Sequence, residues 1–182
     1  MIESIITSKT RIRLLTKFFL NNNISSYLRS LETEFQEAPN GIRVELIRLE
    51  NAGLLATHLK GNKKMYKANT EHPLYIDIHN IILKKVGIDE IIHKVLDEVG
   101  NLKKAYLTGD LAKGTDSRLI DITLIGNNID MPFLGKCIEK VEDLIDRKIR
   151  IIIIEDIKMD TYFLNTPKLL LWEADKLPKR VQ

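Results

Sequence analysis

The most restrictive feature of this chain is an eight-residue run in its first half, Arg48-Leu49-Glu50-Asn51-Ala52-Gly53-Leu54-Leu55. Ile42, Leu46 and Leu49 have the spacing of one helix face. Gly53 is placed to end that helix, because glycine adopts the left-handed conformation of a helix C-terminus without strain. Apolar residues resume at Leu54, so the run predicts the end of a helix, its cap and the start of an extended segment.

Two further helices are predicted before this run, and two extended segments after it. The helices cover 10–20, with Ser8 as its cap, and 26–35. Residues 38–41 are predicted to form a turn before the third helix at 42–51, whose outward side chains should be Arg43, Glu45, Arg48 and Glu50. The extended segments, 54–58 and 65–68, are joined by Lys60-Gly61-Asn62-Lys63-Lys64. The pattern therefore indicates three helices followed by a hairpin with a basic tip.

Charge is distributed unevenly between the two parts of the chain. Residues 1–70 contain 11 Lys and Arg against 6 Asp and Glu, a net charge of +5, whereas the remaining residues contain 17 against 19, a net charge of −2. A basic first part is typical of a segment that binds a polyanion, although a solvated surface would show the same excess.

Three segments of this first part resemble the ArsR-like winged helix-turn-helix regulators. They are Leu49 to Leu55, the stretch Ser8-Lys9-Thr10-Arg11-Ile12-Arg13-Leu14-Leu15, and Gly61-Asn62-Lys63-Lys64-Met65-Tyr66. The resemblance implies a recognition helix that enters the major groove of duplex DNA and a hairpin, or wing, that contacts the DNA backbone. It also implies a homodimer that reads two half-sites. A protein–protein module is the alternative use of such a domain.

This resemblance singles out eight candidate DNA-binding residues. On the recognition helix they are Asn40, Arg43, Ile47 and Arg48, and on the wing they are Lys60, Asn62, Lys63 and Lys64. Arg43 is suited to a guanine edge or to a phosphate, and the wing residues would contribute a salt-sensitive, sequence-independent part of the affinity. Glu45 and Glu50 should weaken the positive potential of the same surface.

A connecting region at 71–100 follows, with helices predicted from Pro73 to Val86 and from Asp89 to Val99. The apolar faces of these helices suit either packing within the chain or a dimer interface. The four histidines, His58, His72, His79 and His93, lack the spacing of metal ligands, so metal sensing is not expected.

The last part of the chain alternates strands with helices. Strands are predicted at 104–108, 120–125, 149–154 and 168–172, with a helix at 132–145 and a short helix near 156–164. We therefore expect an α/β (α+β) chain, in which a mixed-sheet unit follows the winged helix. The expected domains are 1–70, the connector 71–100, and 101–182.

This part resembles the minimal nucleotidyltransferase domain of the polymerase-β-like superfamily. The family signature is Gly-Ser, then Ala-Arg-Gly, then Asp-x-Asp on the next strand. Gly109, Ala112, Lys113 and Gly114 match the loop, with lysine in place of arginine, and Asp121 matches the first aspartate. The resemblance implies a nucleotide site in which carboxylates hold divalent metal ions.

The sequence departs from this signature at the positions that carry the chemistry. Asp110 stands at the serine position, Thr123 at the second aspartate, and Arg150 where a third carboxylate is usual. A lone Asp121 cannot assemble a two-metal site, so the remnant Gly109, Asp110 and Asp121 are expected to lack catalysis, and no metal is expected.

Two rescues of this site stay open. Asp110, Asp121 and either Glu155 or Asp156 would form a rearranged metal cluster. Alternatively, Gly109, Lys113, Gly114 and Arg150 would bind a nucleotide or another anionic effector without turning it over. The structural alternatives are simpler: Asp110 caps the short helix after Gly109, and Asp121 pairs with Arg150 across neighbouring strands.

The sequence thus predicts a DNA-binding transcriptional regulator, a homodimer on double-stranded DNA, whose last domain serves dimerisation or ligand sensing. The alternative is an active nucleotidyltransferase or antitoxin-type protein acting on a protein, an RNA or a small molecule. No cofactor is expected, except Mg²⁺ in that alternative. The single cysteine and the lack of a long apolar run predict a cytoplasmic protein without membrane contact.

Overall fold

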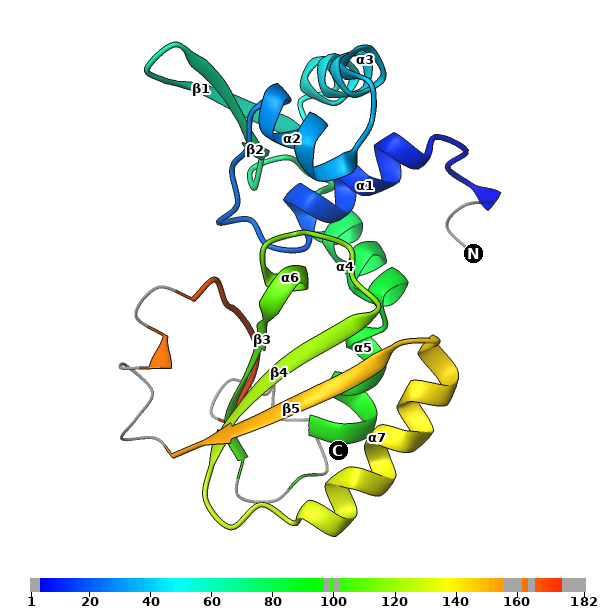
Figure 1. Ribbon diagram of the computed structural model, residues 1–182, viewed down its shortest axis with the longest axis vertical. Coiled ribbons are helices and arrows are strands. Elements are labelled where there is room, and N and C mark those ends of the chain that lie inside the picture. Colours follow the sequence, from blue (N-terminus) through cyan, green and yellow to red (C-terminus); the bar gives the residue numbers. More distant parts are fainter. Residues whose placement is uncertain (1–3, 97–98, 100–101, 156–161, 164–165, 175–182) are drawn as a thin grey trace. The chain divides into compact units, whose positions relative to one another are not determined.

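The computed structural model describes the chain except residues 1–3, 97–98, 100–101, 156–161, 164–165 and 175–182 (Figure 1). Contacts divide the chain into two compact units. Unit 1 comprises 1–85 and 114–116, and unit 2 comprises 86–113 and 117–182. The predicted division into domains at 1–70, 71–100 and 101–182 stays a prediction. Among the described residues, no helix is long and apolar enough to cross a membrane.

Unit 1 contains three helices followed by a two-stranded hairpin, in the order that the sequence predicts. The helices are α1 (Lys9–Phe19), α2 (Leu28–Phe35) and α3 (Pro39–Asn51). The Ser8 side chain caps α1, as predicted, by accepting a hydrogen bond from the Arg11 amide at 3.2 Å. The helices enclose a core of fully buried side chains: Leu14, Phe18, Phe19, Leu20, Leu31, Ile42 and Leu46.

The predicted turn at 38–41 is wrong, because α3 already begins at Pro39. Proline suits the first turn of a helix, because an amide proton there would have no acceptor within the helix and because the fixed φ of proline is helical. The end of α3 is confirmed. Gly53 has a φ of 73°, and the amides of Gly53 and Leu54 return to the carbonyls of Glu50 and Leu49 at 2.8 and 3.0 Å.

The hairpin consists of β1 (Leu55–Lys60) and β2 (Lys63–Ala68), which pair antiparallel from Leu55 opposite Ala68 to Lys60 opposite Lys63. Only Gly61 and Asn62 remain in the turn, fewer residues than predicted. Gly61 has a φ of 61°, a conformation that the two-residue hairpin turn requires. Ser26 pairs with Tyr66, so the segment before α2 is tied to the hairpin.

Helix α4 (Tyr75–Val86) follows the hairpin and starts two residues later than predicted from Pro73. In unit 2, α5 (Ile88–Ile91) continues as a π-helical turn, η2 (Ile92–Leu96), where one helix was predicted at 89–99. The predicted short helix near 156–164 lies largely outside the described residues.

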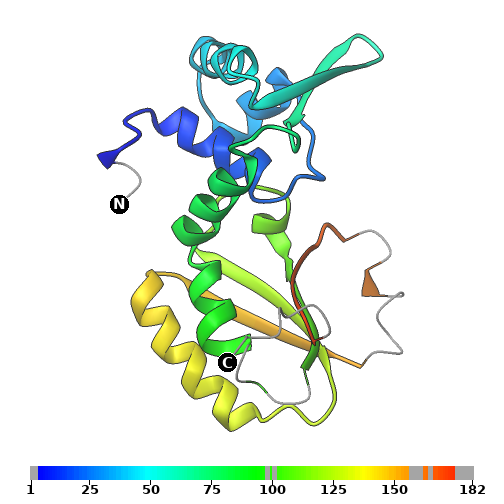
Figure 2. The ribbon, with the colours of Figure 1, turned by 180° about the vertical axis from the view of Figure 1, so that it is seen from behind.

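Unit 2 is built on a four-stranded mixed sheet in the order β5–β4–β3–β6. The strands are β3 (Leu102–Thr108), β4 (Leu119–Gly126), β5 (Lys148–Ile154) and β6 (Leu169–Glu173). Only β4 and β5 are parallel, joined by α7 (Met131–Ile145), which packs with α5 and η2 on one face of the sheet (Figure 2). The predicted mixed α and β fold class is confirmed.

A short helix, α6 (Gly109–Ala112), directly follows β3. Its N-cap is Thr108, with no side-chain capping bond. The prediction that Asp110 caps this helix is therefore wrong, because Asp110 lies inside its first turn, where a side chain no longer has the geometry of a cap.

Candidate functional site

The outward face of α3 is formed by residues one helical turn apart. Asn40, Val44, Ile47 and Asn51 lie along the centre of this face, with Arg43 and Arg48 on either side, and all six are exposed. Val44 is 40% exposed and Ile47 is 45% exposed. The structure thus places the four predicted helix residues on one surface, and it adds Val44, which the sequence prediction missed. The sequence could have predicted this position, because Val44 follows Asn40 by four residues and residues four apart lie on the same face of a helix.

Glu45 does not face outward, so that prediction is wrong. Its side chain is 7% exposed and accepts hydrogen bonds from Arg11 Nε at 2.8 Å, from Ser8 Oγ at 3.0 Å and from Arg48 Nη1 at 3.1 Å. Burial alone would raise the pKa of Glu45, but the hydrogen bonds from Arg11 and Ser8 and the charges of Arg11 and Arg48 together lower it. The carboxylate is therefore ionised, and the guanidinium groups of Arg11 and Arg48 neutralise its charge.

Glu50 is neutralised on the hairpin side of α3. Lys64 Nζ donates to Glu50 Oε2 at 2.8 Å, and Thr57 Oγ1 donates to Oε1 at 3.3 Å. The hydrogen bond to Glu50 raises the pKa of Lys64. Lys64, predicted as a DNA-binding residue, thus fixes the hairpin to α3 and offers less charge to a ligand than its position suggests.

The remaining cations of the hairpin are exposed. They are Lys60, Lys63 and Lys67, and the neutral Asn62 of the turn is exposed as well. Lys63 Nζ lies 4.3 Å from the centre of the Tyr27 ring. Within the part of the chain that the structure describes, Arg43, Lys60, Lys63 and Lys67 have no carboxylate partner. The outward face of α3 and the hairpin together therefore carry a net positive charge.

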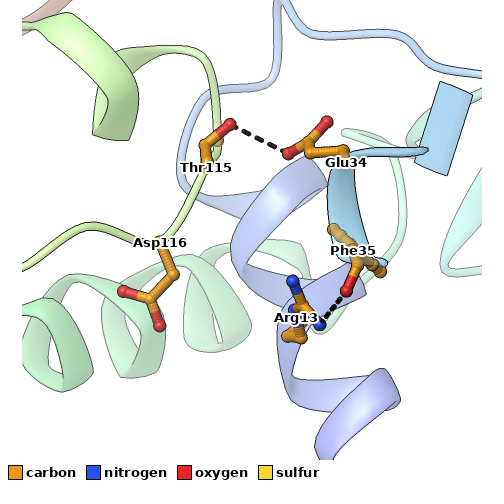
Figure 3. A pocket seen from close by; sticks show the side chains of 6 residues that line it. Arg13, Glu34, Phe35, Thr115 and Asp116 are labelled. Carbon is orange, nitrogen blue, oxygen red and sulfur yellow. Dashed lines mark hydrogen bonds between the residues drawn. The ribbon is translucent and has the colours of Figure 1, made fainter. Parts of the chain in front are cut away.

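A small pocket lies in unit 1. It is lined by Arg13, Glu34, Phe35, Gly114, Thr115 and Asp116 and has a volume of about 40 Å³ (Figure 3). Its lining residues form hydrogen bonds with one another: Thr115 Oγ1 donates to Glu34 at 2.8 Å, and Arg13 donates to the Phe35 carbonyl at 2.8 Å. This volume holds only a few water molecules, which leaves no room for an organic ligand.

The second candidate site centres on Asp121 of β4. Asp121 is 9% exposed and lies opposite Arg150 in the parallel register of β4 and β5. Arg150 Nε donates to Asp121 Oδ1 at 2.5 Å, which confirms the predicted ion pair, and this bond raises the pKa of Arg150. Thr123, two residues along β4, is fully buried and neutral.

The geometry of Gly109 depends on the same carboxylate. Gly109 has a φ of 65°, and a Cβ atom there would overlap Asp121 Oδ2. The loop therefore needs glycine at this position for two reasons, the backbone conformation and the close approach of Asp121. Gly114, also at positive φ, lies against the main chain of Lys17 in unit 1.

The proposed anion-binding cations each face a carboxylate. Lys113 Nζ lies 3.2 Å from Asp110 Oδ1, and Arg150 is bound to Asp121. Among the described residues no group of three His, Cys, Asp or Glu side chains could hold a metal ion. The rearranged cluster of Asp110, Asp121 and Glu155 is therefore not formed, and Asp156 lies outside the described residues.

Comparison with known proteins gives little beyond this geometry. No family model and no curated protein matches the chain. A toxin–antitoxin crystal structure with AMP-PNP is 21% identical over 47% of this chain and 73% of its own, with a TM-score of 0.37. A presumed nucleotidyltransferase from Sulfolobus solfataricus is 19% identical over 62% of this chain and 98% of its own, with a TM-score of 0.37.

The first of these is described as a toxin–antitoxin and the second as a nucleotidyltransferase, and neither is described as a DNA-binding regulator. At this TM-score the overlap is too low to support an argument about fold or activity. The ArsR-like resemblance of the first part stays a prediction.

Proposed function

We propose that this chain binds duplex DNA through the outward face of α3 and the hairpin β1–β2, as a regulatory protein without nucleotidyl-transfer activity. The observation that supports this is the neutralisation of Glu45. The one carboxylate that the sequence places in the middle of α3 is buried and bonded to Arg11 and Arg48. The face that remains is cationic and apolar, which suits a DNA groove.

The geometry suits the two parts of a duplex. A single helix fits the major groove, where α3 would present its exposed stripe, and a hairpin beside it reaches the sugar-phosphate backbone. Lys60, Lys63 and Lys67 of the hairpin and Arg43 of α3 are the cations for phosphate contacts. If four phosphates are neutralised per copy, the logarithm of the affinity falls by about 3 to 4 for each tenfold rise in salt.

Fluorescence anisotropy with labelled duplex, measured over a series of salt concentrations, tests this. The triple variant K60A/K63A/K67A is expected to bind more weakly at low salt and to show a slope smaller by about 3. K136A/K140A, which removes two exposed lysines of α7, is the matched control and should leave the slope unchanged. No binding at low salt, or equal slopes for the two variants, would contradict the proposal.

Nucleotidyl transfer to a protein, an RNA or a small molecule is the competing function, and one of the two solved structures is described as a nucleotidyltransferase. The described residues oppose it, because Arg150 holds Asp121 and Thr123 offers no charge to a metal. Incubation with labelled nucleoside triphosphate and Mg²⁺ separates the two functions. We expect no transfer above that of Asp121→Ala; Mg²⁺-dependent transfer that this substitution abolishes would contradict our assignment.

Unit 2 then has a supporting role. We propose that it serves dimerisation or the sensing of an anionic effector. Displacement of Arg150 from Asp121 by an added anion would be the first sign of sensing, because both anion-site cations are paired in the structure.

A further inference from the structure

The centre of the outward face of α3 is apolar where a solvated helix would be polar. Val44 and Ile47 are 40% and 45% exposed, whereas the core-facing residues of the same helix, Ile42, Leu46 and Leu49, are buried. The fold therefore does not need apolar side chains at 44 and 47. Both are β-branched, and β-branched residues have lower helix propensity than polar residues such as lysine or glutamate.

The surroundings of this apolar pair indicate its partner. Arg43 and Arg48 lie on either side of it, and Asn40 and Asn51 lie at its two ends. No carboxylate of α3 is left to oppose an anion, since Glu45 and Glu50 are both neutralised within unit 1. A partner that meets cations at the edges and apolar groups at the centre is therefore a polyanion with apolar groups along its surface.

The major groove of DNA has this chemistry. The C5-methyl group of thymine is the apolar group that base edges present there, and Val and Ile side chains can contact it. Asparagine, which lies at both ends of the pair, forms two hydrogen bonds with the N6 and N7 atoms of adenine, the partner of thymine. The apolar pair and the two amides therefore favour the same base pair.

We propose that Val44 and Ile47 select duplex DNA with thymine at the contacted positions by packing on its methyl groups. This inference rests on the proposed DNA binding and names the sequence class that α3 prefers. It also assigns a specificity role to Val44.

The test uses two duplex polymers that differ only in these methyl groups, poly(dA-dT) and poly(dA-dU). The full chain is expected to bind poly(dA-dT) more tightly, by about fourfold for each methyl group that it covers, which is the effect of burying one CH₂ group. Competition anisotropy at one fixed salt concentration measures the ratio, and poly(dG-dC) gives the affinity for a groove without thymine.

The double variant Val44→Ser and Ile47→Ser, which leaves no methyl group at either position, separates methyl contact from other differences between the polymers. Both positions are exposed, and serine has a helix propensity close to that of valine and isoleucine, so the variant should unfold at nearly the same temperature as the parent chain. It should bind the two polymers equally. Leu144→Ser, at a residue of α7 that is 61% exposed, is the control and should keep the discrimination of the parent chain.

The outcomes separate the thymine inference from the proposed DNA binding. Equal affinity of the parent chain for the two polymers overturns the thymine inference but leaves DNA binding intact. Discrimination that persists in the double serine variant also overturns it, because the preference then arises from shape or from other residues. Failure to bind any of the polymers at low salt overturns the inference together with the proposed function. If the apolar pair instead bound a protein, the first of these results would be found.

Discussion

Replacement of Glu45 by glutamine tests the most unexpected contact in unit 1. Glutamine keeps the size of the side chain and one acceptor oxygen but removes the charge that Arg11 and Arg48 bind. Hydrogen bonds to a charged group contribute about 1.5–3 kcal/mol each. Both guanidinium groups regain water when the charge is lost, because they are 36% and 61% exposed. We therefore expect the free energy of unfolding to fall by about 2 kcal/mol in total.

Urea unfolding followed by circular dichroism measures this change, and the same loss lowers the melting temperature of a chain of 182 residues by about 4–8 °C. Glu50→Gln is the matched control, because it removes one carboxylate from the same helix. The Glu50 side chain is 27% exposed, against 7% for Glu45, so the control should lose clearly less stability.

The difference between the parent chain and Glu45→Gln should depend on pH. The pKa of Glu45 is lowered on folding from its ordinary value of 4.5, so its contribution is complete above that value. It is lost as the pH falls through the lower pKa of the folded chain. Equal stability of the two proteins at neutral pH, or a difference that persists undiminished in acid, would refute the burial and pairing of Glu45.

Three further changes have distinct expected results. Gly109→Ala should lower the free energy of unfolding by about 2–4 kcal/mol, because a Cβ atom would overlap Asp121. Gly61→Ala is the comparison: the φ is similar and the surrounding space is open, so this change should lower the free energy of unfolding by only about 1–2 kcal/mol. Equal losses of the two variants in urea unfolding would contradict this. Gly135→Ala should raise the free energy of unfolding by roughly 0.5–1 kcal/mol, because alanine is favoured over glycine inside a helix and this exposed position of α7 has open space for a methyl group. A lower melting temperature than that of the parent chain would contradict this. Lys64→Ala should weaken duplex binding by exposing the charge of Glu50, and adding Glu50→Gln should restore most of the affinity in anisotropy; the reasoning fails if the second change restores nothing.

Local signals predicted the elements well. The order of helices and strands, the Ser8 cap and the left-handed Gly53 were all available from short stretches of sequence, because caps and glycine ends act over a few residues. The pairing of Asp121 with Arg150 could also be predicted, since α/β patterning places the two strands side by side.

Contacts between distant residues could not be predicted in the same way. Glu45 and Arg11 are 34 positions apart, and no local pattern indicates that a helix rather than solvent neutralises that carboxylate. Lys64 and Glu50 are 14 positions apart and meet only because the hairpin folds back toward α3. The sequence therefore predicted which candidate residues of α3 share one exposed face, whereas the charges that this face presents became clear only from the structure.

The affinity of Arg43→Ala for duplex DNA tests the account most directly, because Arg43 is exposed on α3 and contributes nothing to the core. We expect binding to weaken by about fivefold or more at fixed salt, with an unchanged melting temperature, and Lys136→Ala of α7 to bind like the parent chain. Equal affinity of Arg43→Ala and the parent chain would contradict the claim that α3 faces DNA.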